Sequence, residues 1–119
     1  MKGLISFAEN VIYEKDNILM GGDFNQSITF DFGTDGDRGN REVQSRFNAL
    51  GLHDTLSTYN NRLVPTFKNS KGGKIVHQLD YLYASKKLSK KLLSSKAMAE
   101  LKILENGLSD HLPVVSTFS

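Results

Sequence analysis

The sequence contains no cysteine, little proline and no long apolar run. Without cysteine, the chain cannot form a disulfide framework, use a thiolate nucleophile or bind zinc or an iron–sulfur cluster through sulfur. No apolar run approaches the roughly 18–20 residues that span a bilayer. The N-terminal apolar stretch is interrupted by Glu9 and Asn10, which is not typical of a signal peptide. We therefore expect a soluble protein that has no membrane span and is located in the cytoplasm.

Residues 1–119 are expected to form a single domain, because a domain commonly has roughly 100–200 residues. The formal net charge of +2 conceals an asymmetry between the two halves of the chain. Residues 1–60 carry 5 Lys and Arg against 9 Asp and Glu, whereas residues 61–119 carry 10 against 4. Much of the positive excess lies between residues 86 and 96. This segment could attract a polyphosphate backbone, or it could be a solvated connection that keeps the domain soluble.

Hydrophobic periodicity in the first half predicts a helix, a strand and a second helix. Apolar residues follow a helical stripe over residues 4–12, and the continuous apolar run 18–20 predicts a central strand that is buried on both faces. Residues 26–40 are rich in Gly, Asp, Asn and Ser, which indicates a long loop. The helical period returns in residues 43–50, and Gly51 is placed to end that helix.

The second half begins with the pattern of a β-hairpin. Residues 63–68 and 74–83 each predict a strand, and residues 69–73 predict the turn between them. In the second strand, Gln78 and Asp80 are expected on one face, because side chains alternate along a strand. The residues expected on the opposite, core-facing side are Leu79, Tyr81 and Tyr83.

Two further strands are predicted after the lysine-rich segment. Residues 97–103 alternate between apolar and more polar side chains, which favours a strand over a helix. Residues 112–118 form the last predicted strand, which the chain enters through Pro113. Helices and strands therefore both contribute to the predicted fold.

Three short segments place polar side chains where a strand ends or where a core would hold apolar ones. In GGDFN, Asp23 and Asn25 can point a carboxylate and an amide into one pocket, although the same residues also form ordinary Asx turns. In HQLDY, Asp80 lies between apolar residues, so it needs a partner such as histidine unless it faces solvent. In LSDHLPV, Asp110 and His111 place an oxygen ligand beside an imidazole, as a surface loop could also do.

In this order, the segments GGDFN, QLDY and LSDHLPV resemble the endonuclease/exonuclease/phosphatase superfamily, the deoxyribonuclease-I-like metal-dependent phosphoesterases. Residues 47–54 also resemble the helix and Gly-Leu-x-Asp turn of that family, and Thr66-Phe67 before a hairpin fits as well. The likeness extends from about Ile18 to Phe118. It implies an α+β fold that is half of a four-layer α/β/β/α sandwich, with a mainly antiparallel or mixed β-sheet and helices on one face.

The resemblance also implies a role for each of the polar residues. Asp23 would activate or orient the attacking water or hold a metal ion, and Asn25 would hydrogen-bond the phosphoryl group. Asp80 would orient His111, which would contact the phosphate or act as general acid or base. Asp110 would bind the divalent ion, Mg²⁺ with Mn²⁺ as the alternative. Phosphoryl transfer needs such a hard cation on oxygen ligands together with positioned hydrogen-bond donors.

The resemblance covers the C-terminal half of the superfamily fold. The metal-binding Glu of the family and its second catalytic His or Tyr lie in the first half, and Glu9, Glu14 and Glu42 do not occupy a matching motif. A single half would leave one sheet face bare, which is a larger apolar patch than soluble monomers usually expose. We therefore expect the chain to associate with itself or with a missing N-terminal half, and to hydrolyse weakly alone.

Alternative interpretations remain for other residues and for the function. Residues 31–42 match part of an EF-hand calcium loop, but Gly33 and Arg38 do not, so a loop near the site is preferred. His53 and His77 are expected to be structural or exposed. The chain is interpreted as a Mg²⁺-dependent phosphoesterase that hydrolyses phosphodiester or phosphomonoester bonds, and its basic second half favours nucleic acid as substrate. The alternative is a truncated, inactive relative that serves as a binding or assembly module.

Overall fold

The computed structural model describes residues 17–25, 27, 40–68, 75–99 and 102–119. The helix predicted over residues 4–12, the turn 69–73 and most of the loop 26–40 lie outside the described residues. The same holds for residues 31–39 of the possible calcium loop, whereas its last residues begin a helix.

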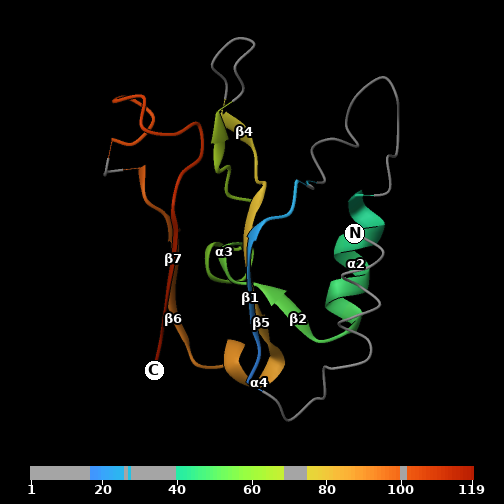
Figure 1. Ribbon diagram of the computed structural model, residues 1–119. Coiled ribbons are helices and arrows are strands. Elements are labelled where there is room, and N and C mark those ends of the chain that lie inside the picture. The colour runs from blue at the N-terminus through green and yellow to red at the C-terminus, as the bar shows by residue number, and fades with distance from the viewer. Residues whose placement is uncertain (1–16, 26, 28–39, 69–74, 100–101) are drawn as a thin grey trace.

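The central element of the fold is β5 (Asp80–Ser85), which pairs on both sides with antiparallel neighbours. β1 (Leu19–Asp23) lies on one side of it and β2 (Leu52–Asp54) on the other, as Figure 1 shows. The prediction that the run 18–20 forms a central strand buried on both faces is therefore wrong. β1 is the edge strand of this sheet and is mostly exposed, because β5 carries the aromatic side chains around which the core packs.

A cluster of aromatic side chains forms the core on one face of this sheet. Tyr81 and Tyr83 of β5 stack with ring centroids 5.3 Å apart, and Phe24 lies 5.5 Å from Tyr83. Phe47 of α2 (Asn40–Ala49) packs on Tyr83 at 4.8 Å. Both tyrosines are buried, so their predicted place in the core is confirmed. Helix α2 confirms the helix predicted in this part of the chain, and Gly51 follows it with φ +79°, a conformation that residues with a Cβ rarely adopt.

The predicted β-hairpin is present, but its second strand is interrupted. β3 (Phe67–Lys68) pairs with β4 (Ile75–His77), and β5 begins only after Gln78 and Leu79. The continuous strand predicted over residues 74–83 is therefore wrong. Gln78 is buried, where its Nε2 donates to Oδ2 of Asp54 at 2.8 Å and its Oε1 accepts from the N–H of Val64 at 3.1 Å. These bonds hold Gln78 inside the protein and account for the break between β4 and β5.

The remaining elements form a second antiparallel layer beside the sheet. Helix α3 (Thr55–Asn60) begins at Asp54, whose Oδ1 accepts from the N–H of Leu56 at 3.1 Å. β6 (Leu92–Ala97) pairs with β7 (Val114–Phe118), which confirms the strand predicted at the end of the chain. The strand predicted over residues 97–103 is wrong, because β6 ends at Ala97 and Lys102 has φ +54°, which is incompatible with a strand.

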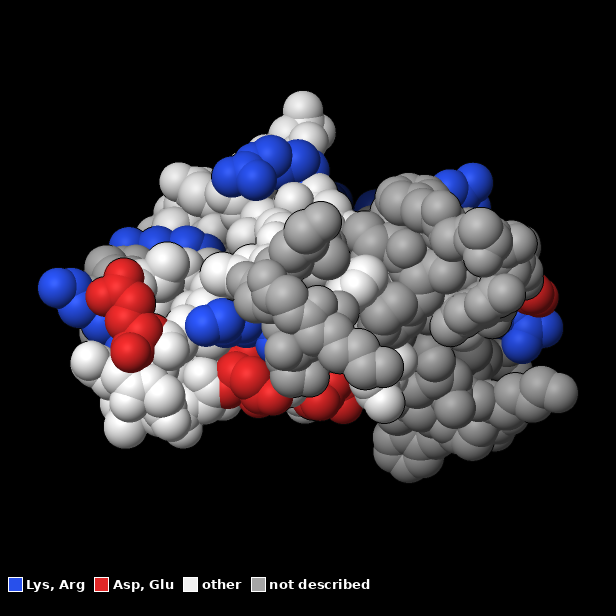
Figure 2. Space-filling view, turned by 90° about the horizontal axis from the view of Figure 1, so that it is seen from above, with Lys and Arg blue, Asp and Glu red and all other residues white. Residues whose placement is uncertain are grey.

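The lysine-rich segment lies at the end of β5 opposite to Asp80. Helix α4 (Lys86–Ser89) directly follows β5, and Figure 1 shows it at the bottom of the molecule, whereas β4 lies at the top. In the view from above, Lys and Arg residues lie dispersed among other described residues rather than in one patch (Figure 2). Within the described part of the chain, no helix has both the length and the apolar character that crossing a bilayer requires.

The fold class is α+β, with antiparallel strand pairs throughout the described residues. This confirms the coarse prediction. The arrangement of layers in a four-layer sandwich stays a prediction.

Candidate active site

Asp80 and His111 form the shortest polar contact among the predicted site residues. His111 Nδ1 lies 2.7 Å from Asp80 Oδ2, although 31 residues separate the two in sequence. Asp80 is the first residue of β5, and His111 forms an isolated antiparallel bridge with Phe67 of β3. The imidazole packs against the Phe67 ring with centroids 4.9 Å apart. The side chain of His111 is therefore fixed on one edge by a carboxylate and on one face by an aromatic ring.

Thr66 connects the segments that carry Asp80 and His111. Its hydroxyl donates to Asp80 Oδ2 at 2.7 Å and accepts from the backbone N–H groups of Leu79 and Asp80, both at 3.1 Å. Its carbonyl accepts from the N–H of Leu112 at 2.7 Å. Thr66 is fully buried, so water does not compete for these bonds. We assigned no role to Thr66 from the sequence, where the only signal was its place before Phe67.

Asp23 lies opposite Asp80 in the sheet, since the two are paired in the register of β1 and β5. Paired residues point to the same face, and Asp23 Oδ2 lies 3.8 Å from His111 Nε2. Asp23 Oδ1 accepts from the N–H of Asn25 at 2.8 Å, and Asn25 has φ +52°. The Asx turn considered for this segment is therefore present, and one carboxylate oxygen still faces His111. Asn25 is exposed at the edge of the group.

Asp110 approaches the group from the other side of His111. Its Oδ1 lies 3.8 Å from His111 Nε2, and its side chain is 63% exposed. The carbonyl of Asp110 accepts from the N–H of Lys68 at 2.8 Å, which fixes the backbone beside the hairpin. Asp23, Asp80, Asp110 and His111 thus converge from three distant segments, whereas His53 and His77 are half-buried and outside this group.

The carboxylates determine the protonation of His111. Partial burial lowers the pKa of the imidazole, but the hydrogen bond to Asp80 and the charges of Asp80, Asp23 and Asp110 together raise it above its ordinary value of 6.5. The protonated form of His111 consequently persists to higher pH than that of an ordinary imidazole. A cationic imidazole next to a possible phosphate position can donate a hydrogen bond to an anionic oxygen or transfer a proton.

The donor set fits a hard divalent cation better than a nitrogen-preferring one. Ligand atoms of Asp23, Asp80 and His111 all lie within 4.8 Å of one another. Oδ2 of Asp80 already contacts Thr66 and His111, and the raised pKa of His111 disfavours the neutral imidazole that a metal requires. The carboxylates of Asp23 and Asp110 remain, and Mg²⁺ is commonly bound by one or two carboxylates together with substrate phosphate.

A hollow of about 250 Å³ adjoins this group. Asp23 and Asp80 line one end, and the remaining lining comes from neighbouring residues of β1, β5 and the start of β7. Gly21 and Leu82 both line this space, and a Cβ at Gly21 would lie 2.9 Å from Cδ1 of Leu82, so the leucine side chain would have to move. The site is therefore accessible to a ligand larger than water from the exposed face of β1.

Comparisons with known proteins concern the fold of the chain. No protein-family model matches the chain, and no curated protein matches it. Solved structures do match, with a TM-score of 0.81 in each of three cases and 99% of this chain covered. They are a 3′ phosphatase, NExo, from Neisseria bound to product DNA hairpin (20% identity), an AP endonuclease from Archaeoglobus fulgidus (18%) and the 3′-5′ exonuclease NExo from Neisseria meningitidis (20%).

The chain spans 51% of the length of each of these proteins. At this level of identity the likeness concerns the fold. These neighbours are members of the superfamily that the three sequence segments resemble. The predicted resemblance to the endonuclease/exonuclease/phosphatase superfamily is therefore confirmed for the fold, which the chain shares with about half of each of these enzymes.

Proposed function

We propose that the chain is the phosphate-hydrolysing part of a Mg²⁺-dependent phosphoesterase that acts on nucleic acid. The observation that carries this proposal is the convergence of Asp23, Asp80, Asp110 and His111, with His111 Nδ1 2.7 Å from Asp80 Oδ2. Carboxylates beside a protonated imidazole supply what phosphoester hydrolysis needs, namely places for a cation and a donor to anionic oxygens. The similar solved structures support the same chemistry.

Each residue has its own role in the proposed hydrolysis. Asp23 orients the attacking water and accepts its proton, and Asp23 and Asp110 are the residues that would hold Mg²⁺. The bound ion would neutralise phosphate charge. Water oxygen forms the new bond to phosphorus while the bond from phosphorus to the leaving oxygen breaks, and the leaving oxygen takes up a proton from solvent. Asp80 keeps His111 protonated and oriented, so that Nε2 donates to a phosphate oxygen, and Asn25 stabilises the same group through its amide.

Nucleic acid is the substrate class that the neighbours favour, since their names describe an AP endonuclease, an exonuclease and a phosphatase bound to a DNA hairpin. The lysine-rich segment does not contribute to this choice. Helix α4 lies at the opposite end of β5 from Asp80, so its lysines are not placed to contact the phosphate that is cleaved. Selection of substrate therefore rests on groups closer to the site.

We also propose that the exposed face of β1 and β5 packs on a second body. Leu19 on this face is 50% exposed, and Gly21 and Leu82 adjoin it on the same side of the sheet. A second copy of the chain, or the other half of the fold, would remove this surface from water. A catalytically weak or inactive relative that serves as a binding or assembly module is the alternative function.

The test is cleavage of supercoiled DNA and of an activated phosphodiester, with Mg²⁺ and with chelator. We expect Mg²⁺-dependent hydrolysis that Asp23→Asn and His111→Ala each reduce by about 10²–10⁴-fold, the usual contribution of a general acid or base. His53→Ala is the matched control, since His53 lies outside the group, and it should retain activity. Hydrolysis that persists in both site variants, or its absence with retained DNA binding, would overturn the catalytic proposal and favour the binding module.

A further inference from the structure

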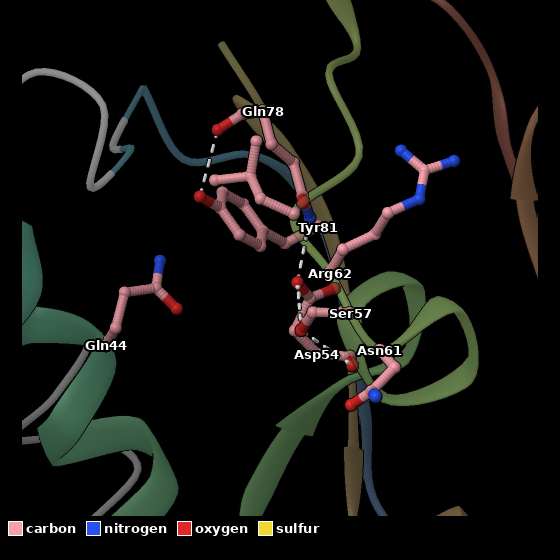
Figure 3. A pocket seen from close by; sticks show the side chains of 8 residues that line it. Gln44, Asp54, Ser57, Asn61, Arg62, Gln78 and Tyr81 are labelled. Carbon is pink, nitrogen blue, oxygen red and sulfur yellow. Dashed lines mark hydrogen bonds between the residues drawn. The ribbon is translucent and has the colours of Figure 1, made fainter.

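A second pocket lies on the face of the sheet that carries the aromatic core. It has a volume of about 350 Å³ and is bounded by α2, by the start and end of α3, and by residues next to β5. In Figure 3, Gln44 of α2 faces the other labelled residues across the open space. Ligand pockets range from roughly 300 to 1,000 Å³, so this one has room for a single ring system rather than for a longer segment.

The floor of this pocket is polar and held in place. Asp54 is buried, and its carboxylate accepts from Gln78 Nε2 at 2.8 Å, from Ser57 Oγ at 3.0 Å and from the N–H of Leu56 at 3.1 Å. Tyr81 donates through its hydroxyl to the carbonyl of Gln78 at 2.9 Å. A ligand would thus meet an acceptor and an aromatic wall that are already ordered, which reduces the entropy cost of binding.

The rim of the pocket carries donors that are free to bind. Arg62 and Asn61 are exposed, and neither side chain has a hydrogen bond or ion pair with another described residue. Asn61 ends α3 with φ +56°, so the chain turns there and places both residues at the mouth of the pocket. Leu63 supplies an apolar wall beside them. A cation thus lies at the mouth and a carboxylate at the floor.

This distribution of charge determines which end of a ligand enters. Asp54 offers acceptor oxygens in a buried place and Arg62 offers N–H donors at the surface, so a phosphate belongs at the mouth, where a guanidinium can bind it through two N–H groups. The inner part of the ligand must be flat, partly apolar and able to donate towards Asp54. Amide and carboxylate side chains that meet such a ring recognise the edge of a nucleobase. A nucleotide satisfies all of these requirements.

The pocket and the candidate active site are close to each other. Gln78 and Tyr81 line the pocket, whereas Asp80 between them belongs to the site on the other face of β5. Consecutive residues are only about 3.8 Å apart along the chain, so both places lie at the same end of the strand. Because they lie on opposite faces of the sheet, a strand of nucleic acid with one phosphate at His111 would pass around this end of β5 to place a neighbouring nucleotide in the pocket.

We propose that this pocket binds one unpaired nucleotide of the nucleic-acid substrate, with its base against Tyr81 beside Asp54 and its phosphate on Arg62. The choice of ligand rests on the proposed function. The pocket would make the protein select single-stranded or unpaired nucleotides next to the phosphate that is cleaved. Its occupancy does not require a metal ion or hydrolysis.

The direct test is an NMR experiment in which ligands are added to the ¹⁵N-labelled full chain in the presence of chelator. The signals of the side-chain amides are monitored. We expect nucleoside monophosphates and a single-stranded tetranucleotide to shift the signals of Gln44 and Asn61, while Asn48 on the exposed side of α2 stays unchanged. Inorganic phosphate is the control ligand and should leave the side-chain amide signal of Gln44 unchanged. Absence of any shift in the pocket with both nucleotide ligands, or equal shifts with inorganic phosphate, would overturn the proposal.

Variants separate the pocket from the candidate active site. Arg62→Ala should weaken binding of the tetranucleotide about tenfold, since it removes a charge-assisted bond, whereas Arg62→Lys should retain part of the affinity. Lys90→Ala is the matched loss of an exposed cation and should have little effect. His53→Ala, which lies outside the candidate active site and is not among the residues that line the pocket, should bind as the parent does. If the parent shows these shifts without hydrolysing DNA, the proposed function is wrong and the proposed nucleotide pocket is supported. If the parent hydrolyses DNA without the shifts, the nucleotide pocket is wrong and the proposed function is supported.

Discussion

At the scale of single residues, one carboxylate oxygen organises the candidate site. Oδ2 of Asp80 contacts both the Thr66 hydroxyl and His111 Nδ1 at 2.7 Å. The hydroxyl of Thr66 has one proton to donate and two lone pairs, and all three are used. Asp80 therefore has a single orientation, and His111 takes its position from Asp80.

We predict that Asp80→Asn lowers the pKa of His111, because it removes a charge that stabilises the imidazolium. His111 has a raised pKa in the folded protein, so its contribution to stability is complete below the unfolded value. That contribution is lost as the pH rises from about 6.5 through the folded pKa. The stability advantage of the parent over Asp80→Asn should shrink across this window. NMR titration of the His111 C2–H signal measures the pKa; an unchanged value would contradict the assigned contact.

We predict that Thr66→Val reduces hydrolysis about tenfold or more, whereas Thr66→Ser retains most of it, because only serine keeps the bond to Asp80. The variants should also differ in the pH dependence of hydrolysis, since Thr66 acts through Asp80 on His111. A purely structural role predicts loss of stability in both variants and no change in the pH profile. Urea unfolding and a pH–rate profile distinguish these outcomes.

The sequence indicated a candidate site through residues whose chemistry is unusual for their position. Asp80 among apolar neighbours and the Asp110–His111 pair both indicated a site, and the structure brings them together with Asp23. Thr66 was not predicted, because threonine is common near strands and nothing local distinguishes a hydroxyl that binds a carboxylate 14 residues away.

At the scale of elements, Asp54 and Gln78 connect β2, α3 and the segment before β5. Periodicity predicted α2 and β7, because their apolar residues follow one simple repeat. It failed at Gln78, because the sequence pattern does not distinguish a buried glutamine from an exposed one. Gln78 is buried because its amide donates to Asp54. Periodicity failed again at residues 97–103, where alternation continues beyond Ala97, the last residue of β6, although the described residues after it, 98–99 and 102–103, belong to no strand.

We predict that Asp54→Ala lowers the free energy of unfolding by about 2–4 kcal/mol. The change removes the N-cap of α3 and leaves the buried amide of Gln78 without its acceptor. Ser57→Ala, which removes only one bond to the same carboxylate, should cost about 1 kcal/mol. Chemical denaturation of both variants tests the ranking, and equal losses would show that the bond from Gln78 contributes nothing.

At the scale of the whole molecule, the candidate site lies at one end of the sheet and the lysine-rich segment at the other. The exposed face of β1 beside the site is the surface that we expect a second body to cover. Leu19 is half exposed there, whereas Leu108, in a turn, is 71% exposed and outside β1.

We predict that the chain self-associates, and that Leu19→Lys weakens this association while Leu108→Lys does not. A charge on the face of β1 would be buried in the assembly, which is costly without a partner. Gel filtration with multi-angle light scattering measures the mass of each variant. A monomeric parent chain that is well folded and fully active would contradict both self-association and the need for another half.

The most direct test of the central claim is whether a divalent cation binds beside His111. We predict that Mn²⁺, used as a paramagnetic substitute for Mg²⁺, broadens the C2–H signal of His111 at concentrations that leave His53 unchanged. Asp110→Asn and Asp23→Asn should each reduce this broadening, because their carboxylates remain available to a hard cation. Equal broadening of both histidines, or broadening that neither variant reduces, would contradict the existence of one metal and phosphate site formed by these side chains.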